Sequence, residues 1–331
     1  MNENNFYNLL DTRVKKYKSK LIYQKRDGWS WKQITWQDLE AEVKSISSFL
    51  LDLKFNIGDQ VVFNSTNTLE SLLFEMAVFL VGGISIPVNN DEEILKILDN
   101  TKDNYYLFSD NKESIDNILL NNLYSGRIIK SFVVTEENTD IAEKYLNYKN
   151  VVHFGFIKRK KLNDELQKLS QSISGETTAT IFYQFNGFST SKINRFSQEK
   201  IINLLKIIQK KLKFITEENQ TYAYLPVQNS FSKFINLLNI QIGNRGAIAS
   251  NLKDFYDDIL EVMPNIIYLT KPQLEFIMDE FSINSLGSIK ENFGGRLKYI
   301  LTNTSPNNDV KIALKKAGIS IIELNQLSIV E

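Results

Sequence analysis

Short apolar runs alternate with longer amphipathic segments along most of this chain. In the first half, from residue 59 onward, four apolar runs have the length and composition of strands, at 59–64, 84–88, 105–109 and 128–134. The segments between them carry apolar residues at helical spacing, at 69–81, 91–100 and 112–121. Asp91 stands where it can cap the second of these helices. Strands separated by helices of this length predict crossover connections and a mainly parallel sheet.

The second half of the chain continues this alternation. It predicts helices at 199–214, 232–240, 252–262, 272–280 and 308–317. It predicts strands at 220–225, 246–250, 265–269, 297–301 and 320–324. We therefore expect an α/β fold in which helices cover both faces of mainly parallel sheets.

The most apolar region, residues 72–88, contains Glu75 and a Gly-Gly pair before Pro87. This pattern indicates a buried helix that runs into a strand, and not a membrane span. The first residues, MNENNFYNLL, lack the basic start and apolar stretch of a signal peptide. The chain has no cysteine, which excludes disulfides, thiolate catalysis and Cys-ligated metal sites. Together these features predict a cytoplasmic protein without a membrane span.

The net charge of the chain does not favour a polyanionic partner. The chain has 39 basic and 39 acidic residues, so no net field draws it to nucleic acid or to an anionic membrane. The basic runs at 15–20 and 158–161 are interpreted as solvated surface, the second as the solvated start of a helix in the most linker-like region, 158–176. His153, the only histidine, lies in an apolar run and is interpreted as an inert imidazole beside a strand.

Residues 179–201 carry the most informative local pattern. An apolar strand ending at Tyr183 is followed by a polar loop with one glycine and several hydroxyls, then Lys192, then a helix near Gln198. Strand, hydroxyl-rich loop, lysine and helix is the layout of a phosphate-binding turn. The loop resembles the nucleotide-gripping loop of adenylate-forming enzymes, the superfamily of acyl-CoA synthetases, luciferases and peptide-synthetase adenylation domains. That family typically has Tyr-Thr-Ser-Gly-Thr-Thr-Gly-x-Pro-Lys-Gly.

Further segments are similar to the same family in the same order. Residues 27–39 resemble its G-W-x-x-x-T-W/Y-x-E-L segment, 57–62 its G-D-R-V-A strand, and 82–88 its G-A/G-x-x-V-P-L segment. Residues 65–70 resemble its N-S-x-E helix start, and 224–227 its L-P-L-x-H segment. The resemblance implies a layered α/β sandwich of two mainly parallel sheets flanked by helices. It further implies one lobe of about residues 58–200 and another formed by about 1–57 and 201–331.

The chain departs from the family at most positions that carry its chemistry. Asn229 replaces a histidine, and Asn325 replaces the tyrosine that lines the adenine site. Residues 302–306 read TNTSP in place of S-G-G/S-A-P, and Ile329 falls on the glutamate that holds Mg²⁺ in the family. The chain ends at Glu331, so the resemblance also implies that the family's C-terminal lid domain, with its lysine, is absent.

The resemblance still suggests where remnants of the sites lie. The vestigial phosphate loop consists of Asn186, Gly187, Ser189, Thr190, Ser191 and Lys192. The candidates for the adenine or acyl site are Asn229, Asn303, Thr304, Asn325 and Ser328. We assign no catalytic residue and no metal ligand. The helix at 231–240, with Tyr222 and Tyr224, falls where the family builds its acyl tunnel and is interpreted as core.

These substitutions weaken the expected chemistry. Gln184, Phe185 and Phe188 stand in place of hydroxyl residues, and each lost charge-assisted hydrogen bond is worth roughly 1.5–3 kcal/mol. The aliphatic Ile329 cannot ligate a hard cation, which takes oxygen ligands.

Two functions stay open at this point. In the first, the chain is a degenerate acyl-CoA synthetase-like protein with weak or no adenylation activity, which binds a protein partner or a lipid. In the second, it is a fatty-acid adenylating enzyme or acyl-CoA ligase that uses ATP and Mg²⁺ and is completed by a C-terminal domain on another chain. A fatty acid or acyl ligand and an acyl carrier protein are the partners that these readings imply. A fragment of a longer protein is a third reading.

Overall fold

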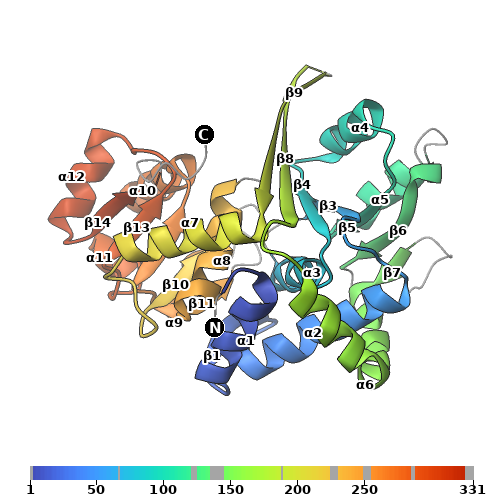
Figure 1. Ribbon diagram of the computed structural model, residues 1–331. Helices are drawn as coiled ribbons and strands as arrows, with labels where there is room; N and C mark the ends of the chain where they lie inside the picture. Colours follow the sequence, from blue (N-terminus) through green and yellow to red (C-terminus); the bar gives the residue numbers. More distant parts are fainter. Residues whose placement is uncertain are drawn as a thin grey trace. The chain divides into compact units, whose positions relative to one another are not determined.

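The computed structural model describes residues 3–65, 68–120, 125–134, 145–187, 189–223, 230–248, 255–284 and 288–324. The chain divides into two compact units. The first unit contains residues 1–18, 36–203 and 226–233, and the second contains 19–35, 204–225 and 234–331. Each unit holds one seven-stranded sheet (Figure 1).

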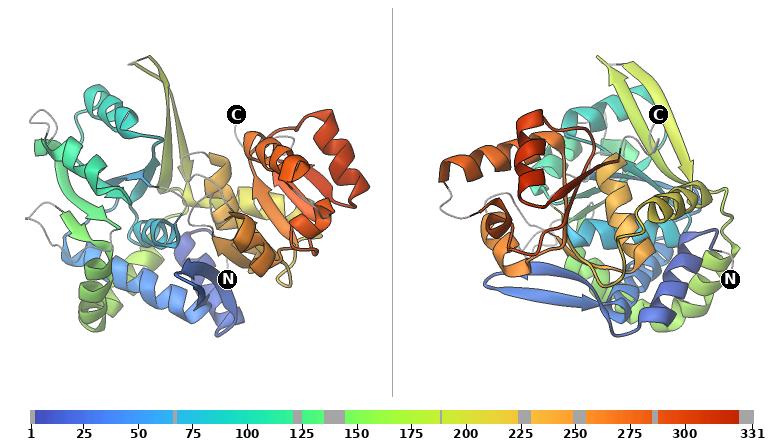
Figure 2. Two further views of the ribbon diagram at one scale, coloured as in Figure 1. Left: turned by 180° about the vertical axis from the view of Figure 1, so that it is seen from behind. Right: turned by 90° about the vertical axis from the view of Figure 1, so that its left-hand side faces the viewer.

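The sheet of the first unit has the strand order β7-β6-β5-β3-β4-β8-β9. Its strands are β3 (Gln60–Asn64), β4 (Ile84–Pro87), β5 (Tyr105–Ser109), β6 (Ile128–Val133), β7 (Tyr145–Asn147), β8 (Thr178–Asn186) and β9 (Ser189–Ser197). All neighbouring strands are parallel except β8 and β9, which form an antiparallel hairpin at one edge. Figures 1 and 2 show this hairpin extending beyond the rest of its sheet.

Helices cover both faces of this first sheet. They are α1 (Phe6–Tyr17), α2 (Trp36–Asp52), α3 (Leu69–Leu80), α4 (Asp91–Asn100), α5 (Lys112–Leu120) and α6 (Tyr148–Ser172), with a short 3₁₀ turn at Ser125–Arg127. Val62 and Leu107 pack with α4 and α5 on one face. Phe63 and Phe108 lie on the opposite face, where both rings contact Phe74 of α3. Strand side chains alternate between faces, so neighbouring residues in β3 and β5 meet different helices.

The sheet of the second unit has the order β14-β13-β12-β10-β11-β1-β2. Its strands are β1 (Leu21–Asp27), β2 (Ser30–Thr35), β10 (Gln220–Ala223), β11 (Arg245–Ile248), β12 (Ile266–Leu269), β13 (Tyr299–Thr302) and β14 (Ser320–Glu323). Here too the strands are parallel except for an antiparallel edge hairpin, formed by β1 and β2.

The helices of the second unit are α9 (Phe255–Val262), α10 (Lys271–Asn284), α11 (Ile289–Asn292) and α12 (Asn308–Lys316). One apolar core joins α9, α10 and α12 to the strands through residues such as Ile259, Leu274, Leu314, Ile267 and Ile300. Two further helices, α7 (Gln198–Lys211) and α8 (Ser230–Ile242), begin in the first unit and continue in the second.

The predicted fold class is confirmed, because both sheets are mainly parallel and flanked by helices. The predicted elements from residue 59 to 134 and from 198 to 324 are present within a few residues of their expected bounds. The structure places residues 1–18 and 36–57 in the first unit, whereas the family resemblance implied that all of 1–57 belong to the other lobe. The physical reason is the apolar face of α2, whose Val43, Ile46 and Leu50 are fully buried.

Three local expectations differ from the structure. The N-cap of α4 is Asn90, whose side chain accepts a hydrogen bond from the Glu93 N–H, and Asp91 is the first helical residue. His153 lies exposed on α6 and not beside a strand. The region 158–176 is no linker up to residue 172, because α6 continues to Ser172. The basic run 158–161 is helical, but it lies in the middle of α6, which begins at Tyr148, and not at the start of a helix.

Candidate functional site

The residues of the expected phosphate loop form the end of the β8–β9 hairpin. Gln184 pairs with Lys192, Phe185 with Thr190 and Asn186 with Ser189. Ser191 is the extra residue of an irregularity in this ladder, and its Oγ donates to the Gln184 carbonyl over 2.9 Å. Gly187 follows β8 with φ 62°, a left-handed conformation that suits the tight turn of a hairpin. Most of the predicted open loop is therefore β-strand: residues 184–186 belong to β8 and residues 189–192 to β9.

This geometry matters because a phosphate cradle needs successive backbone N–H groups that converge on one point. In an extended strand, successive N–H groups point to opposite edges. Residues 184–186 and 189–192 are extended, so their amides alternate in direction and do not form such a concave surface.

The side chains of the candidate loop are mostly in solvent. Asn186, Ser189, Ser191 and Lys192 are exposed. Thr190 is half-buried, and its Oγ1 is buried without a hydrogen-bond partner among the described residues. The structure thus brings Asn186, Gly187, Ser189, Thr190, Ser191 and Lys192 together at one end of the hairpin, as the sequence predicts for neighbours in the chain.

A cation–π contact connects the outer part of β8 to α4. The Tyr183 and Phe185 rings stack with centroids 6.1 Å apart, and the Lys96 ammonium lies 5.6 Å from the Phe185 centroid. Burial raises the pKa of Tyr183, and the positive charge of Arg195 offsets part of that rise. Phe185, which replaces a small hydroxyl residue of the family, is therefore a packing residue here.

The hairpin nevertheless has a weakly basic character. Residues 177–198 include Lys192 and Arg195 and no aspartate or glutamate. Such a segment can attract an anion through charge alone, without a backbone cradle.

The second group of candidates lies in the second unit, where Asn303 and Thr304 follow β13. Asn303 Oδ1 accepts from the Lys271 N–H over 3.0 Å, at the first residue of α10. The Thr302 hydroxyl donates to the Thr304 carbonyl over 3.1 Å. The Asn303 side chain thus connects the end of a strand to the start of a helix. Asn229, Asn325 and Ser328 lie outside the described residues, as do Tyr224 and Ile329.

A hollow that sequence reasoning missed lies at the carboxyl ends of β3, β4 and β5. Its volume is about 610 Å³, and it is lined by Asn64, Ser65, Asn89, Asn90, Asp91, Glu92, Asp110 and Asn111. The strand order β4-β3-β5-β6-β7 reverses direction between β3 and β5, and open α/β sheets bind ligands at such a reversal. The signal in the sequence was a polar pair at or just after the end of each of these strands: Asn64-Ser65, Asn89-Asn90 and Asp110-Asn111.

The chemistry of this hollow is acidic. Asp91 Oδ1 accepts from Asn64 Nδ2 over 2.7 Å and from the Ser114 hydroxyl. Asp91, Glu92 and Asp110 supply carboxylates, whereas no lysine or arginine is among the described residues that line it. A polyanion such as a nucleotide triphosphate would meet repulsion from these carboxylates.

A lysine that sequence reasoning missed is fully buried in the first unit. Lys233 Nζ donates to Glu75 Oε1 and, over 2.9 Å, to Ser85 Oγ. The Ser85 hydroxyl in turn donates to the same Glu75 oxygen. Burial lowers the pKa of the Lys233 amine, and the Glu75 carboxylate offsets part of that change.

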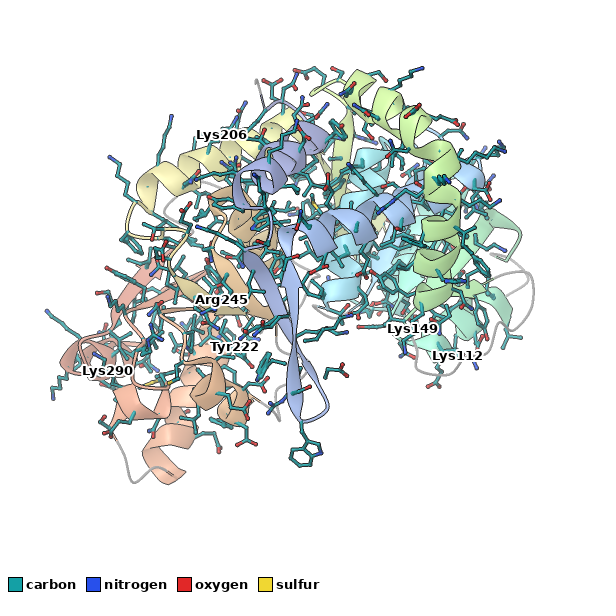
Figure 3. All side chains as sticks on the ribbon, turned by 90° about the horizontal axis from the view of Figure 1, so that it is seen from below. Lys112, Lys149, Lys206, Tyr222, Arg245 and Lys290 are labelled. Carbon is teal, nitrogen blue, oxygen red and sulfur yellow. The ribbon has the colours of Figure 1, made fainter. Side chains whose placement is uncertain are left out.

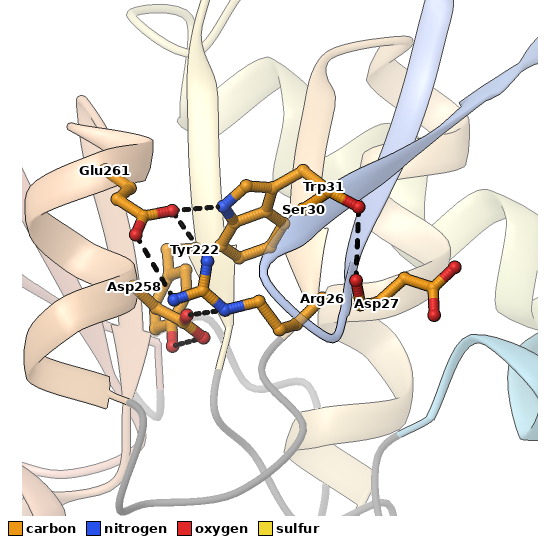
Figure 4. A network of polar contacts seen from close by, with 7 residues as sticks. All are labelled: Arg26, Asp27, Ser30, Trp31, Tyr222, Asp258 and Glu261. Carbon is orange, nitrogen blue, oxygen red and sulfur yellow. Dashed lines mark hydrogen bonds and ion pairs between the residues drawn. The ribbon is translucent and has the colours of Figure 1, made fainter.

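A polar network in the second unit connects the β1–β2 hairpin to α9 (Figure 4). Arg26 forms a two-pronged ion pair with Glu261 at 2.7 and 3.2 Å, and its Nε lies 3.2 Å from Asp258. Trp31 Nε1 donates to Glu261 over 2.7 Å, and the Tyr222 hydroxyl donates to Asp258 over 3.1 Å. Tyr222 is fully buried, which agrees with its interpretation as core. Within the segment 27–39 that resembles the family, Trp31 therefore has a structural role in this unit, whereas Trp29 is fully exposed.

The described part of the chain contains no group of three aspartate, glutamate or histidine side chains that could hold a metal ion. No described helix is both long and apolar enough to cross a membrane.

Comparison with solved structures finds the same fold in several proteins of low sequence identity. A long-chain-fatty-acid-CoA ligase (FadD1) from Archaeoglobus fulgidus has a TM-score of 0.73 at 14% identity, covering 94% of this chain and 60% of that one. The inhibitor-bound N-terminal domain of FACL13 from Mycobacterium tuberculosis has a TM-score of 0.72 at 13% identity, covering 96% and 75%.

A third similar structure is a fatty acyl-adenylate ligase from L. pneumophila in complex with acyl adenylate and pyrophosphate. Its TM-score is 0.70 at 14% identity, and the match covers 96% of this chain and 53% of that one. Identities this low show a common fold alone. No curated protein matches the sequence.

The sequence itself matches the model of a protein family described as AMP-binding enzyme, over residues 10–322. This match spans nearly the whole chain and includes the β8–β9 hairpin, the hollow and both sheets. This chain therefore belongs to the AMP-binding enzyme family.

Proposed function

We propose that this chain is a degenerate acyl-CoA synthetase-like protein with weak or no adenylation activity, which acts in the cytoplasm as a binding or partner-interaction module. The observation that carries the proposal is the geometry of the β8–β9 hairpin. In its extended residues 184–186 and 189–192, successive backbone N–H groups point to opposite edges of the strand. A triphosphate site needs N–H groups that converge on one point.

Three further features support this reading. Phe185 packs against α4, so bulk occupies a position where the family has a small hydroxyl residue. The hollow at the carboxyl ends of β3, β4 and β5 is lined with carboxylates. Asn303 is already engaged by the backbone of α10. In the family, ATP with Mg²⁺ is the reactant, and these features disfavour its phosphates by geometry and by charge.

The ligand of such a module would be a fatty acid, an acyl group or a protein. The fold is that of proteins whose names describe them as fatty-acid CoA ligases and acyl-adenylate ligases. A chain with this fold and without adenylation chemistry would retain acyl binding, or recognition of an acyl carrier protein, as its function.

The alternative is an ATP-dependent fatty-acid adenylating enzyme completed by a C-terminal domain on another chain. The specific observation in its favour is the acid-free hairpin, in which Lys192, Ser189 and Ser191 are exposed near a glycine turn. In that case Lys192 would contact the phosphates of ATP.

The deciding experiment measures pyrophosphate release and hydroxamate formation with ATP, Mg²⁺ and medium- and long-chain fatty acids. We expect no turnover above background, and no saturable binding of ATP–Mg²⁺ by calorimetry. Binding of a fatty acid or of an acyl-AMP analogue is measured in parallel, because the proposed module binds either an acyl ligand or a protein partner.

The control variants are Lys192→Ala and, on an exposed face of α7, Lys210→Ala. Turnover in the wild type that Lys192→Ala abolishes and Lys210→Ala leaves unchanged would refute the proposal and establish the enzyme.

A further inference from the structure

Helix α6 presents an unusual combination of exposed apolar and basic side chains. Phe154, Phe156 and Ile157 are 40%, 62% and 56% exposed. On the same helix, Lys149, Lys158, Lys160 and Lys161 are exposed, and Arg159 is half-buried. We call one side of this helix the α6 face, defined by Lys149, Phe156, Ile157, Lys160 and Lys161, which lie within about 140° of one another around the helix axis.

The charge on this part of α6 is all of one sign. Residues 148–163 contain five basic residues and no aspartate or glutamate, and the first acidic residue is Asp164. Asp52 of α2 neutralises Lys158 at 3.1 Å, so the positive charge is concentrated toward Lys149, Lys160 and Lys161. This local field exists in a chain whose net charge is zero.

The rotation of α6 about its axis is fixed by a close contact with α2. A Cβ on Gly155 would lie 2.0 Å from the Ser45 carbonyl oxygen, so only glycine allows the two helices to approach this closely. Val151 and Leu166 are buried on the same side. Phe156 and Ile157 therefore cannot turn into the core without separating the helices. Figure 3 shows α6 on the outside of the first unit, with Lys149 labelled at its first turn.

Cation–π contact keeps part of this surface ordered. The Arg159 guanidinium lies 5.6 Å from the Phe156 ring centroid and donates to the Ala41 carbonyl over 3.1 Å. Phe156 is thus positioned as a projecting aromatic ring beside basic groups.

We propose that the α6 face is a docking surface for a lipid bilayer with anionic headgroups. Large apolar side chains that enter the interface, surrounded by lysines that meet anionic phosphates, are the two components of peripheral membrane binding. Charge complementarity selects this occupant, because the exposed ammonium groups of Lys149, Lys160 and Lys161 match anionic phosphates. The proposal does not depend on whether the chain turns over ATP.

The experiment is co-sedimentation of the full chain with vesicles in the absence of ATP. One set of vesicles is phosphatidylcholine alone, and in the other about one lipid in three is phosphatidylglycerol. We expect binding to the anionic vesicles that weakens as salt is added, because salt screens the attraction. Equal binding to both sets, or binding to neither, would overturn the proposal.

Two double variants test the two components separately. Lys160→Gln with Lys161→Gln should lower the partition coefficient by roughly thirtyfold. Each lysine near an anionic surface contributes about 1 kcal/mol of attraction, and the double variant loses two of them. Phe156→Gln with Ile157→Gln should lower it by roughly tenfold or more, because the apolar contact is lost.

The matched controls are Lys210→Gln with Lys211→Gln on α7, and Leu260→Gln on α9, where Leu260 is 52% exposed. Both should bind as the wild type does. Control variants that lose binding as strongly as the α6 variants would contradict a specific face. The proposal would also be contradicted if the wild type were a dimer, and if the α6 variants became monomers while their vesicle binding stayed unchanged.

Discussion

Lys233 is a fully buried charged side chain in an otherwise apolar interior. Its ammonium meets Glu75 and Ser85, and it also lies 5.6 Å and 5.7 Å from the ring centroids of Phe79 and Phe182. A buried ion pair gains little net stability, because desolvation of both groups opposes their attraction. Removing one partner is different, since it leaves the other charge buried and alone.

At this site we expect Lys233→Ala to lower the free energy of unfolding by about 3–5 kcal/mol, because Glu75 would be left buried without a counter-charge. Replacing both partners, with Lys233→Met and Glu75→Leu, should cost much less. Urea unfolding followed by circular dichroism measures both values. A double variant as unstable as Lys233→Ala would show that packing, and not the unpaired charge, causes the loss.

Single residues also show where sequence reasoning reaches its limit. Asn90 and Asp91 are both good N-cap residues, and the choice between them depends on which backbone N–H each side chain can reach. His153 lies in an apolar run, yet it is exposed because that run continues as a helix and not as a strand. Glu75 and Lys233 are 158 positions apart, so no local pattern connects them.

Among the elements, α2 and α6 pack most closely along their length. Gly155 of α6 faces the backbone of Ser45, and α6 is joined further by the hydrogen bond from the Tyr148 hydroxyl to Glu42, at 2.7 Å. This packing explains why residues 36–57 belong to the first unit. It also determines which side of α6 is exposed.

We expect Gly155→Ala to lower the free energy of unfolding by about 1–3 kcal/mol, as overpacking does, although alanine favours a helix by about 1 kcal/mol. The control is Gly126→Ala, because nothing lies within 4 Å of a Cβ at that glycine. Chemical denaturation of both variants measures the difference. Equal stability of the two would contradict the close approach of α2 and α6.

The β8–β9 hairpin is the element on which the proposed loss of adenylation depends. The sequence correctly located a strand ending near Tyr183 and a helix beginning near Gln198. It did not show that residues 189–197 form a second strand. Their polar side chains are typical of a loop, but as an exposed ribbon they need only pair with β8 through the backbone.

The whole molecule uses one design twice. Each unit has a mainly parallel sheet whose central strands are buried, and each sheet has an antiparallel hairpin at an edge. Buried tyrosines are part of both cores. In the first unit, burial raises the pKa of Tyr105 and of Tyr106 to about 12.

These raised pKa values predict a loss of stability in alkali. The unfolded tyrosines release their protons near pH 10.0, whereas the folded ones keep theirs up to about pH 12. Between these values the folded state binds more protons, so the free energy of unfolding falls as pH rises. Lys233, whose pKa is lowered, has the opposite effect below pH 10.5.

Urea unfolding of the wild type and of Tyr106→Phe across this pH range measures the effect. The difference in unfolding free energy between them should decrease as pH rises from about 10 to about 12, because only the wild type must keep that phenol protonated. A difference that is constant with pH would contradict the raised pKa of Tyr106.

The sequence by itself determined the alternation of strands and helices, the two-sided burial of the strands and the family, since these depend on periodicity and on motifs of adjacent residues. It also located the substitutions at positions 184–189. Tertiary structure alone decided the pairing of Lys233 with Glu75, the outward rotation of α6, the hollow between three strand ends and the course of the β8–β9 hairpin. The first three depend on contacts between segments far apart in the chain, and side-chain periodicity carries no information about which distant segments meet. The hairpin is local, but the polar residues of β9 lack the apolar alternation by which a strand is recognised in a sequence.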